Sequence, residues 1–415
     1  MEQKRLEIKS TKPLRELMAK HFLEIDEAVQ TKKQKVAWCT SVGPAELLVG
    51  MGFLVYYPEN HGAMLGSTRL ATDYIPLAVA NGYSPEICSY LTSDIGAYLK
   101  GETPLTKAYG IKSIPKPDVL VYNTNQCRDV YDWFRFYSNE WKIPLFGINT
   151  PQQQPMLRSD VIKLVSAQLQ EMVPGLEKIA GRKFDIDRFR EVIALSRECS
   201  DLWYEALDTA SAVPSPLTFF DACIHMGPAV VMRGRKEAND YYKQHFIPEM
   251  KQRIKDGVSA IEGEKHRFYW EGMPVWGKLR NLSELFSKLK VNVVASTYCS
   301  SWIFSALDPR EPFDSMARAY ASIFITLDDL QKEDYMAEKV KHFNIDGIVY
   351  HDAKTCPNNT NCRHGMVQRL AKKLNVPGLV INGDLNDLRC YSEEQSVTNI
   401  EAFVEQIEEN QVKVK

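Results

Sequence analysis

Short runs of β-branched and aromatic residues alternate with longer amphipathic stretches over much of this chain, and this alternation limits the folds it can adopt. In the first third the apolar runs are KVAWCT from 35, FLVYYPE from 53, DVLVYNT from 118 and PLFGINT from 144. Amphipathic stretches such as DVYDWFRFYSNEW lie between them. Strands that alternate with helices form parallel sheets, because each return to the sheet needs a crossover. We therefore predict an α/β lobe with helices on both faces of a parallel sheet.

The pattern changes in the middle of the chain and then returns. From 156 to about 255 it is helical, as in MLRSDVIKLVSAQLQEMVPGLEKI and FDIDRFREVIALSRECSDLWYEAL. Strand-like runs resume with RFYWEG, VNVVASTY, DGIVYH and PGLVING. The predicted fold is therefore α/β, with two Rossmann- or flavodoxin-like parallel-sheet lobes, 1–155 and 262–415, and a helical middle region, 156–261. The stretch TPQQQPMLRSD after residue 149 is the expected linker.

The charge of the chain is balanced. Its 415 residues include 51 Lys and Arg and 53 Asp and Glu, for a formal net charge of -2. Such a balance gives no field that would attract nucleic acid or an anionic membrane surface, so any anionic ligand needs a local patch. The N-terminus is charged throughout, and no run approaches the roughly 18 apolar residues of a membrane span. We expect a cytoplasmic protein with no nucleic-acid or membrane partner.

Three of the nine cysteines fall where α/β proteins bind ligands. An odd number of cysteines without a signal peptide argues against a disulfide framework. Ligands of open α/β sheets bind beyond the carboxyl ends of the strands. Cys127 and Cys356 each follow a predicted strand, one in each lobe, so their loops are equivalent and could meet across a cleft. Cys88 precedes a predicted helix, whose positive end favours a thiolate.

Simpler interpretations of the cysteines stay open. A single loop cysteine is more often a packed thiol than a ligand, although three at sheet ends favour a ligand set. The gap between Cys356 and Cys362 fits poorly to the short pairs of a structural zinc site. Cys199 and Cys223 fall in helical patterns and are expected to be packed, while Cys299 also follows a strand. The chain has no P-loop motif, so any ATP must be hydrolysed by another protein.

Polar residues follow the first two predicted strands. Ser41 ends the first, and Glu59 and His61 follow the second. A hydroxyl, a carboxylate and an imidazole around one cleft can transfer protons. Alternatively, Ser41 caps the helix that begins at GPAELL and His61 is a solvated loop histidine, whereas the apolar run beside Glu59 favours a functional carboxylate. Glu271 and Trp276 are interpreted as a strand end with core aromatics that could also line the cleft.

Seven motifs, in this order, cover nearly the whole chain: AWCTSVGPAELL, VYYPENHG, GYSPEICSY, NTNQC, RFYWEGMPVW, DGIVYHDAKTC and INGDLNDLRCYSEEQ. They resemble the 2-hydroxyacyl-CoA dehydratase and benzoyl-CoA reductase family of anaerobic, ATP-driven iron–sulfur enzymes. The resemblance implies a [4Fe-4S] cluster at low potential on Cys88, Cys127 and Cys356, with one iron open to the thioester carbonyl. It also implies that Cys362 is no ligand, and that Ser41 and Glu59 match substrate-side positions.

The same resemblance implies a set of partners. These are a homologous second subunit with its own cluster, an activator ATPase that carries a further [4Fe-4S] cluster, ferredoxin as the electron source, and an acyl-CoA substrate.

The motifs differ in the branch of the family that they favour. SDIGAYLKG, HMGPAVVMRG, NVVASTY and GDLNDLR look more like benzoyl-CoA reductase, in particular its B-type subunit, whereas YPEN leans towards the dehydratases. The first expectation is therefore an oxidoreductase that delivers electrons to an aromatic acyl-CoA. The alternative is a hydro-lyase that removes water from a 2-hydroxyacyl-CoA through a ketyl radical. In a third interpretation, this subunit only relays electrons to a partner that binds the substrate.

Overall fold

The N-terminal lobe is built on a four-stranded parallel sheet. The protein is described by a computed structural model that covers residues 7–152 and 156–414. The strand order in this sheet is β2-β1-β3-β4, and Trp38 of β1 lies between Tyr56 of β2 and Leu120 of β3. The strands are β1 (Val36–Cys39), β2 (Leu54–Tyr56), β3 (Val119–Asn123) and β4 (Leu145–Ile148).

The C-terminal lobe repeats this topology. Its order, β6-β5-β7-β8, again places the first strand of the lobe between the second and the third, and all of the pairs are parallel. These strands are β5 (His266–Glu271), β6 (Val291–Ser296), β7 (Gly347–Ala353) and β8 (Gly378–Gly383). Every strand-like run quoted from the sequence therefore forms a strand. The prediction of an α/β fold with two parallel sheets is confirmed.

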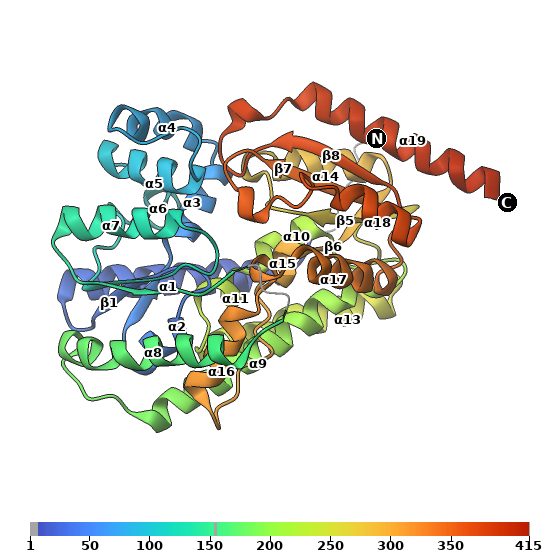
Figure 1. The fold of residues 1–415 in the computed structure, drawn as a ribbon. Helices are drawn as coiled ribbons and strands as arrows, with labels where there is room; N and C mark the ends of the chain where they lie inside the picture. Colours follow the sequence, from blue (N-terminus) through green and yellow to red (C-terminus); the bar gives the residue numbers. More distant parts are fainter. Residues whose placement is uncertain (1–6, 153–155, 415) are drawn as a thin grey trace.

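Helices cover the faces of the N-terminal sheet (Figure 1). In α7, the buried residues Val130, Trp133, Phe134 and Tyr137 follow the spacing of one helix face, and α7 packs on β3 and β4. The helices of this lobe are α1 (Thr11–Thr31), α2 (Ala45–Gly50), α3 (Pro58–Ser67), α4 (Ala71–Ala80), α5 (Ser89–Lys100), α6 (Pro104–Tyr109) and α7 (Asp129–Trp141).

The helices that lie between the two sheets in the sequence pack against both lobes. The long α9 packs on α2, α8 packs on α16, and α10 packs on β6, with the Phe219 ring stacked on Trp270 at 5.3 Å. These helices are α8 (Ser159–Ala180), α9 (Ile186–Asp208), α10 (Phe219–His225), α11 (Gly227–Val231), α12 (Lys236–Tyr241) and α13 (Ile247–Lys255), with a π-helical turn at Tyr242–Phe246 before α13.

One buried apolar cluster runs from Ala37 of β1 through this region to Ile407 of the last helix. The middle helices thus share their core with both sheets. The boundaries 1–155, 156–261 and 262–415 stay a prediction, and residues 153–155 of the expected linker lie outside the described residues.

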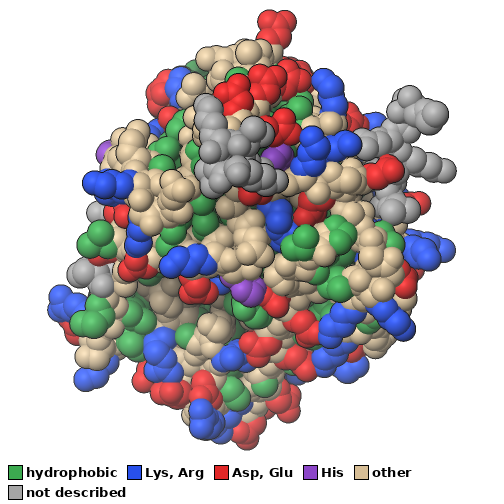
Figure 2. Space-filling model, turned by 90° about the vertical axis from the view of Figure 1, so that its right-hand side faces the viewer, with side chains coloured by type: hydrophobic (Ala, Val, Ile, Leu, Met, Phe, Trp, Pro, Cys, Tyr) green, Lys and Arg blue, Asp and Glu red, His purple; other side chains and the backbone are tan. Residues whose placement is uncertain are grey.

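The C-terminal lobe ends in a long helix that extends away from the second sheet in Figure 1. Its helices are α14 (Leu279–Lys288), α15 (Thr297–Ser300), α16 (Pro312–Ala321), α17 (Asp329–His342), α18 (Met366–Leu374) and α19 (Glu393–Val414), with short 3-10 turns at Trp276–Lys278, Phe324–Thr326, Pro357–Asn359 and Leu388–Cys390. Within the described ranges, no helix combines the length and the apolar character needed to cross a bilayer. Figure 2 shows acidic and basic side chains intermixed over one face, as the balanced composition leads one to expect.

Candidate functional site

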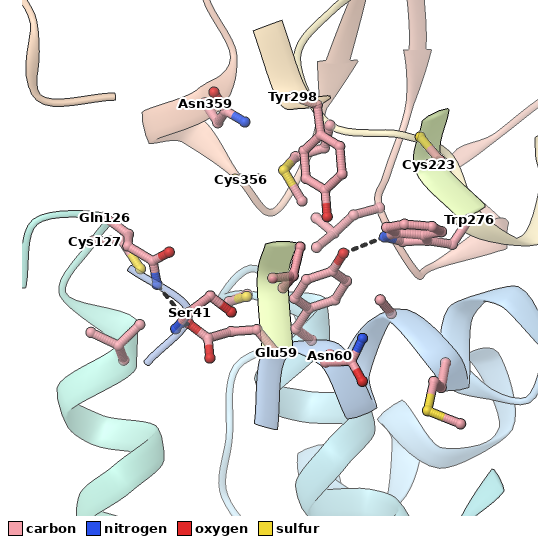
Figure 3. Close-up of a pocket in the computed structure, with 18 of the residues that line it drawn as sticks. Ser41, Glu59, Asn60, Gln126, Cys127, Cys223, Trp276, Tyr298, Cys356 and Asn359 are labelled. Carbon is pink, nitrogen blue, oxygen red and sulfur yellow. Dashed lines mark hydrogen bonds between the residues drawn. The ribbon is translucent and has the colours of Figure 1, made fainter. Parts of the chain in front are cut away.

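A cavity of about 460 Å³ lies between the lobes, at the carboxyl ends of β1, β3 and β7. The strand order reverses between β1 and β3 and again between β5 and β7. Loops diverge at such a switch point and leave a crevice, which is where doubly wound sheets bind ligands. The two switch points contribute to the same cavity, shown in Figure 3.

The structure brings Cys88, Cys127 and Cys356 to this cavity. Cys88 is the residue before α5, Cys127 lies between β3 and α7, and Cys356 follows β7. All three are partly exposed and none is in a disulfide. The three residues thus line one cavity, and their role as ligands stays a prediction.

Hydrogen bonds within and across the lobes fix the cysteine loops relative to one another. Next to Cys88, the Ser89 N–H donates to Thr355 Oγ1 at 3.0 Å. Next to Cys127, the Gln126 carbonyl accepts from Asn358 Nδ2 at 2.9 Å. The Cys88 N–H itself donates to Asp129 Oδ2 at 2.9 Å. Each of the three loops that carry Cys88, Cys127 and Cys356 is thus hydrogen-bonded to a loop that carries another of these cysteines.

A buried carboxylate behind the cysteines supports the same junction. Asp384 is fully buried and accepts hydrogen bonds from Ser89 Oγ at 2.5 Å and from Thr355, through its N–H at 2.9 Å and its hydroxyl at 2.7 Å. The N–H groups of Asn386 and Asp387 donate to the same carboxylate. Sequence reasoning did not single out Asp384. The available signal was an acidic residue at the end of a strand in the motif GDLND.

Burial controls the protonation of the three thiols. It raises the pKa of Cys127 and of Cys356 to about 12, and that of Cys88 well above its usual range. The neighbouring thiols raise the pKa of Cys88 further, because three negative charges would repel one another. The helix end was expected to favour a thiolate at Cys88, but desolvation outweighs it. These sulfurs become thiolates readily only beside a strong positive charge such as a metal ion.

The three cysteines are of the donor type that ligates iron–sulfur clusters. In residues 7–152 and 156–414, no three His, Cys, Asp or Glu side chains are grouped closely enough to hold one metal ion. Three thiols that enter one cavity from three separate loops suit an iron–sulfur cluster, which is ligated by cysteine thiolates on different irons. Cys362, six residues after Cys356, is half-buried against the core and does not line the cavity.

Ser41 and Glu59 meet at the floor of the cavity (Figure 3). The Ser41 N–H donates to Glu59 Oε1 at 2.9 Å, and Gln126 Nε2 donates to the same oxygen at 2.6 Å. The expected cap at Ser41 is wrong, because α2 begins only at Ala45 and no side chain caps it. Gly43 permits the tight turn between Ser41 and α2, since a Cβ there would lie 2.8 Å from Cys39 Sγ.

The Glu59 carboxyl retains one free position. Its Oε2 is buried and has no hydrogen-bond partner among the described residues. Burial raises the pKa of Glu59, while the hydrogen bonds from Ser41 and Gln126 oppose that rise. A carboxyl in this state can exchange a proton with a bound ligand. Sequence reasoning missed Gln126, whose only signal was its position beside Cys127.

His61 lies elsewhere. It was interpreted as a candidate catalytic residue or, alternatively, as a solvated loop histidine, and the second interpretation is wrong because His61 is fully buried within α3. Its Nδ1 lies 2.5 Å from Asp94 Oδ1 and its Nε2 lies 2.9 Å from Thr103 Oγ1. His61 does not line the cavity, and both of its ring nitrogens have partners.

Aromatic side chains form another part of the wall. Trp276 Nε1 donates to the Tyr90 hydroxyl, and the Trp276 and Tyr298 rings meet edge to face with centroids 5.8 Å apart. Trp276 therefore lines the cleft, as one of its two interpretations from the sequence proposed. Cys223, expected to be a packed thiol, also reaches the cavity, and its sulfur lies 3.9 Å from that of Cys299.

Glu271 lies behind the loop that carries Cys356. It is fully buried at the end of β5 and accepts hydrogen bonds from Thr297 Oγ1 and from Asn361 Nδ2, the latter at 2.6 Å. Burial raises its pKa from 4.5 to about 7. Gly272, at φ +93°, brings the chain close to the Asn359 carbonyl, where a Cβ would lie 3.3 Å away. Glu271 thus supports the loop and does not line the cavity.

Comparisons with known proteins agree with the motif order. Residues 40–407 match the protein-family model described as 2-hydroxyglutaryl-CoA dehydratase, D-component. The chain is 30% identical over 401 residues to the (R)-2-hydroxyisocaproyl-CoA dehydratase alpha subunit of Clostridioides difficile, covering 95% of each chain. It is 30% identical over 404 residues to the (R)-phenyllactyl-CoA dehydratase alpha subunit of Clostridium sporogenes, covering 95% of this chain and 97% of that one.

A benzoyl-CoA reductase subunit of Thauera aromatica is 26% identical over 381 residues, covering 88% of this chain and 86% of that one. The two dehydratase subunits are thus more similar to this chain than the reductase subunit is, which supports the alternative that the sequence motifs placed second. The match over residues 40–407 shows that the chain belongs to the 2-hydroxyglutaryl-CoA dehydratase D-component family.

Proposed function

We propose that this chain is the cluster-bearing subunit of a 2-hydroxyacyl-CoA dehydratase, a hydro-lyase that removes water from a 2-hydroxyacyl-CoA. One observation carries the proposal: three cysteines from separate loops of both lobes line the same cavity as Ser41 and Glu59. Relatives named as dehydratase alpha subunits, at 30% identity over nearly the full length, support it.

In this proposal Cys88, Cys127 and Cys356 hold a [4Fe-4S] cluster. When bound, such a cluster supplies single electrons at low potential. Asp384 and the cross-lobe hydrogen bonds hold the three loops in place. The partners that go with this proposal are a homologous second subunit, an activator ATPase with its own [4Fe-4S] cluster, and ferredoxin as the electron source. Names such as "alpha subunit" among the relatives support a multisubunit assembly.

The protein side chains handle the protons. Dehydration breaks one C–O and one C–H bond, and the hydroxyl leaves with a proton as water, without net oxidation of the substrate. Glu59 Oε2, unpartnered among the described residues and with a raised pKa, is suited to give a proton to the leaving hydroxyl, and the proton released from the C–H bond then restores the carboxyl. Ser41 lines the same cavity, and its hydroxyl is suited to contact the thioester.

The experiment uses the anaerobic complex of this chain with its partner subunit, its activator and ATP. Because dehydration is redox-neutral, one activation should support many turnovers, and ATP consumed per product should fall far below one. Ring reduction of an aromatic acyl-CoA instead needs new electrons for every product, so that ratio would stay fixed.

Benzoyl-CoA reduction is the second candidate, supported by the 26% identical relative whose name is that of a benzoyl-CoA reductase subunit. A fixed ratio of ATP to product, with an aromatic acyl-CoA consumed and 2-hydroxyacyl-CoA thioesters inert, would establish that candidate and overturn the dehydratase.

A further inference from the structure

We infer that the acyl group taken by this cavity is apolar and uncharged beyond the hydroxyl-bearing carbon, as in a branched aliphatic or an aromatic acid, and is not that of a dicarboxylic acid. This inference rests on the proposed function, because it specifies the substrate of the same site.

Aromatic rings and thioethers form part of the cavity wall. In Figure 3, Trp276 lies on the opposite side of the view from Cys127, with Tyr298 between them. Trp276 Nε1 donates to the Tyr90 hydroxyl, so the one polar hydrogen of the indole is not available to a ligand. Met64 and Met273 also line the cavity, and methionine adapts its shape to apolar groups.

The charges of the cavity do not suit a second carboxylate. Among its described lining residues, the charged side chains are Glu59, Asp129 and Arg128. The Asp129 carboxylate would repel an acidic acyl group, and Glu59, a proton donor in the proposed function, supplies no positive charge to attract one. The Arg128 side chain is 84% exposed and lies 3.6 Å from Asp132, so it belongs to the solvent-facing rim. A substrate carboxylate inside the cavity would be buried without a cation, which is strongly unfavourable.

The test compares two CoA thioesters of matched shape that lack the hydroxyl and so bind without turnover. In 4-methylpentanoyl-CoA the chain ends in two methyl groups, where succinyl-CoA carries two carboxylate oxygens. Calorimetric titration of the complex should give binding of 4-methylpentanoyl-CoA at least about tenfold tighter than that of succinyl-CoA, a modest figure for an unpaired buried charge.

Variants of this chain place the effect in this cavity. Met64→Arg should reverse or abolish the preference by supplying a cation, whereas Met64→Gln, of similar size and uncharged, should leave succinyl-CoA the weaker ligand. Arg128→Gln should not change the preference. Equal or tighter binding of succinyl-CoA, or its dependence on Arg128, would overturn the inference alone. Failure of both thioesters to bind would overturn the proposed function and this inference together.

Discussion

The backbone N–H of Ser41 donates a 2.9 Å hydrogen bond to Oε1 of Glu59, which leaves Oε2 of the same carboxyl buried and without a partner among the described residues. The two residues follow adjacent parallel strands, β1 and β2, so the sheet itself brings them together. A carboxyl that is fixed through one oxygen and free at the other has the arrangement of a proton donor to a ligand.

Replacing Glu59 by Gln should lower turnover of the complex by about a hundredfold or more, because the amide keeps the shape of the side chain but cannot transfer the proton. The iron content should not change. Steady-state rates and iron analysis of the same preparation check both points. Unchanged turnover would contradict the assignment and favour a subunit that only relays electrons to its partner.

Ser41→Ala separates the hydroxyl from the backbone. The variant keeps the N–H that donates to Glu59 Oε1, but it removes the hydrogen bond of the Ser41 side chain to the same carboxyl and any contact of the hydroxyl with the substrate. We expect turnover to fall by about tenfold, the value of one hydrogen bond made in the transition state. Binding of a non-reactive acyl-CoA serves as the control. A variant with full activity would show that Ser41 acts only through its backbone N–H.

Asp384→Asn should destabilise the junction of the lobes. The amide has the same shape as the carboxylate, but its NH₂ group is a hydrogen-bond donor. In the variant it would face the N–H and O–H donors that hydrogen-bond to the Asp384 carboxylate in the wild type. A loss of about 3 kcal/mol in the free energy of unfolding is expected for such a buried charged group. The matched control is Asp334→Asn, whose carboxylate is 77% exposed and pairs with Lys373. Equal stability of the two variants in denaturant titrations would show that Asp384 does not hold the junction.

Glu271 predicts a pH dependence of stability. The folded protein binds its proton more tightly than the unfolded chain, since its pKa rises from 4.5 to about 7. The stabilisation of the folded protein by this bound proton is fully present below pH 4.5 and is lost as the pH rises through 7. Relative to Glu271→Gln, the wild type should therefore lose about 2 to 3 kcal/mol between pH 5 and pH 8.

Denaturant titrations of both proteins at the two pH values measure this difference, and Glu394→Gln, at an exposed position of α19, controls for the lost charge. A difference between wild type and Glu271→Gln that does not vary with pH would contradict the assignment.

Local sequence patterns were sufficient to predict the strands of both sheets. The run DVLVYNT becomes β3 and DVYDWFRFYSNEW becomes α7, because apolar spacing alone determines which side of each element is buried. The strand-end rule also sufficed to bring Cys127 and Cys356 to one cavity.

The contacts that complete the site could not be predicted in the same way. The hydrogen bond between Ser89 and Thr355 joins residues 266 positions apart, and that between Asn358 and Gln126 spans 232 positions. No local pattern encodes such pairs. Two local interpretations also failed: α2 begins only at Ala45, so Ser41 caps no helix, and His61 lies within α3 and is buried, not solvated.

Iron and acid-labile sulfide per chain, measured on anaerobically purified protein, test most directly the claim that cysteines of both lobes share one cluster. We predict about four of each per chain, with most of both lost in the serine variants of Cys88, Cys127 and Cys356 and both retained in Cys362→Ser and Cys199→Ser. Zinc in place of iron, protein without metal after reconstitution, or a Cys362→Ser variant as depleted as Cys356→Ser would contradict the account.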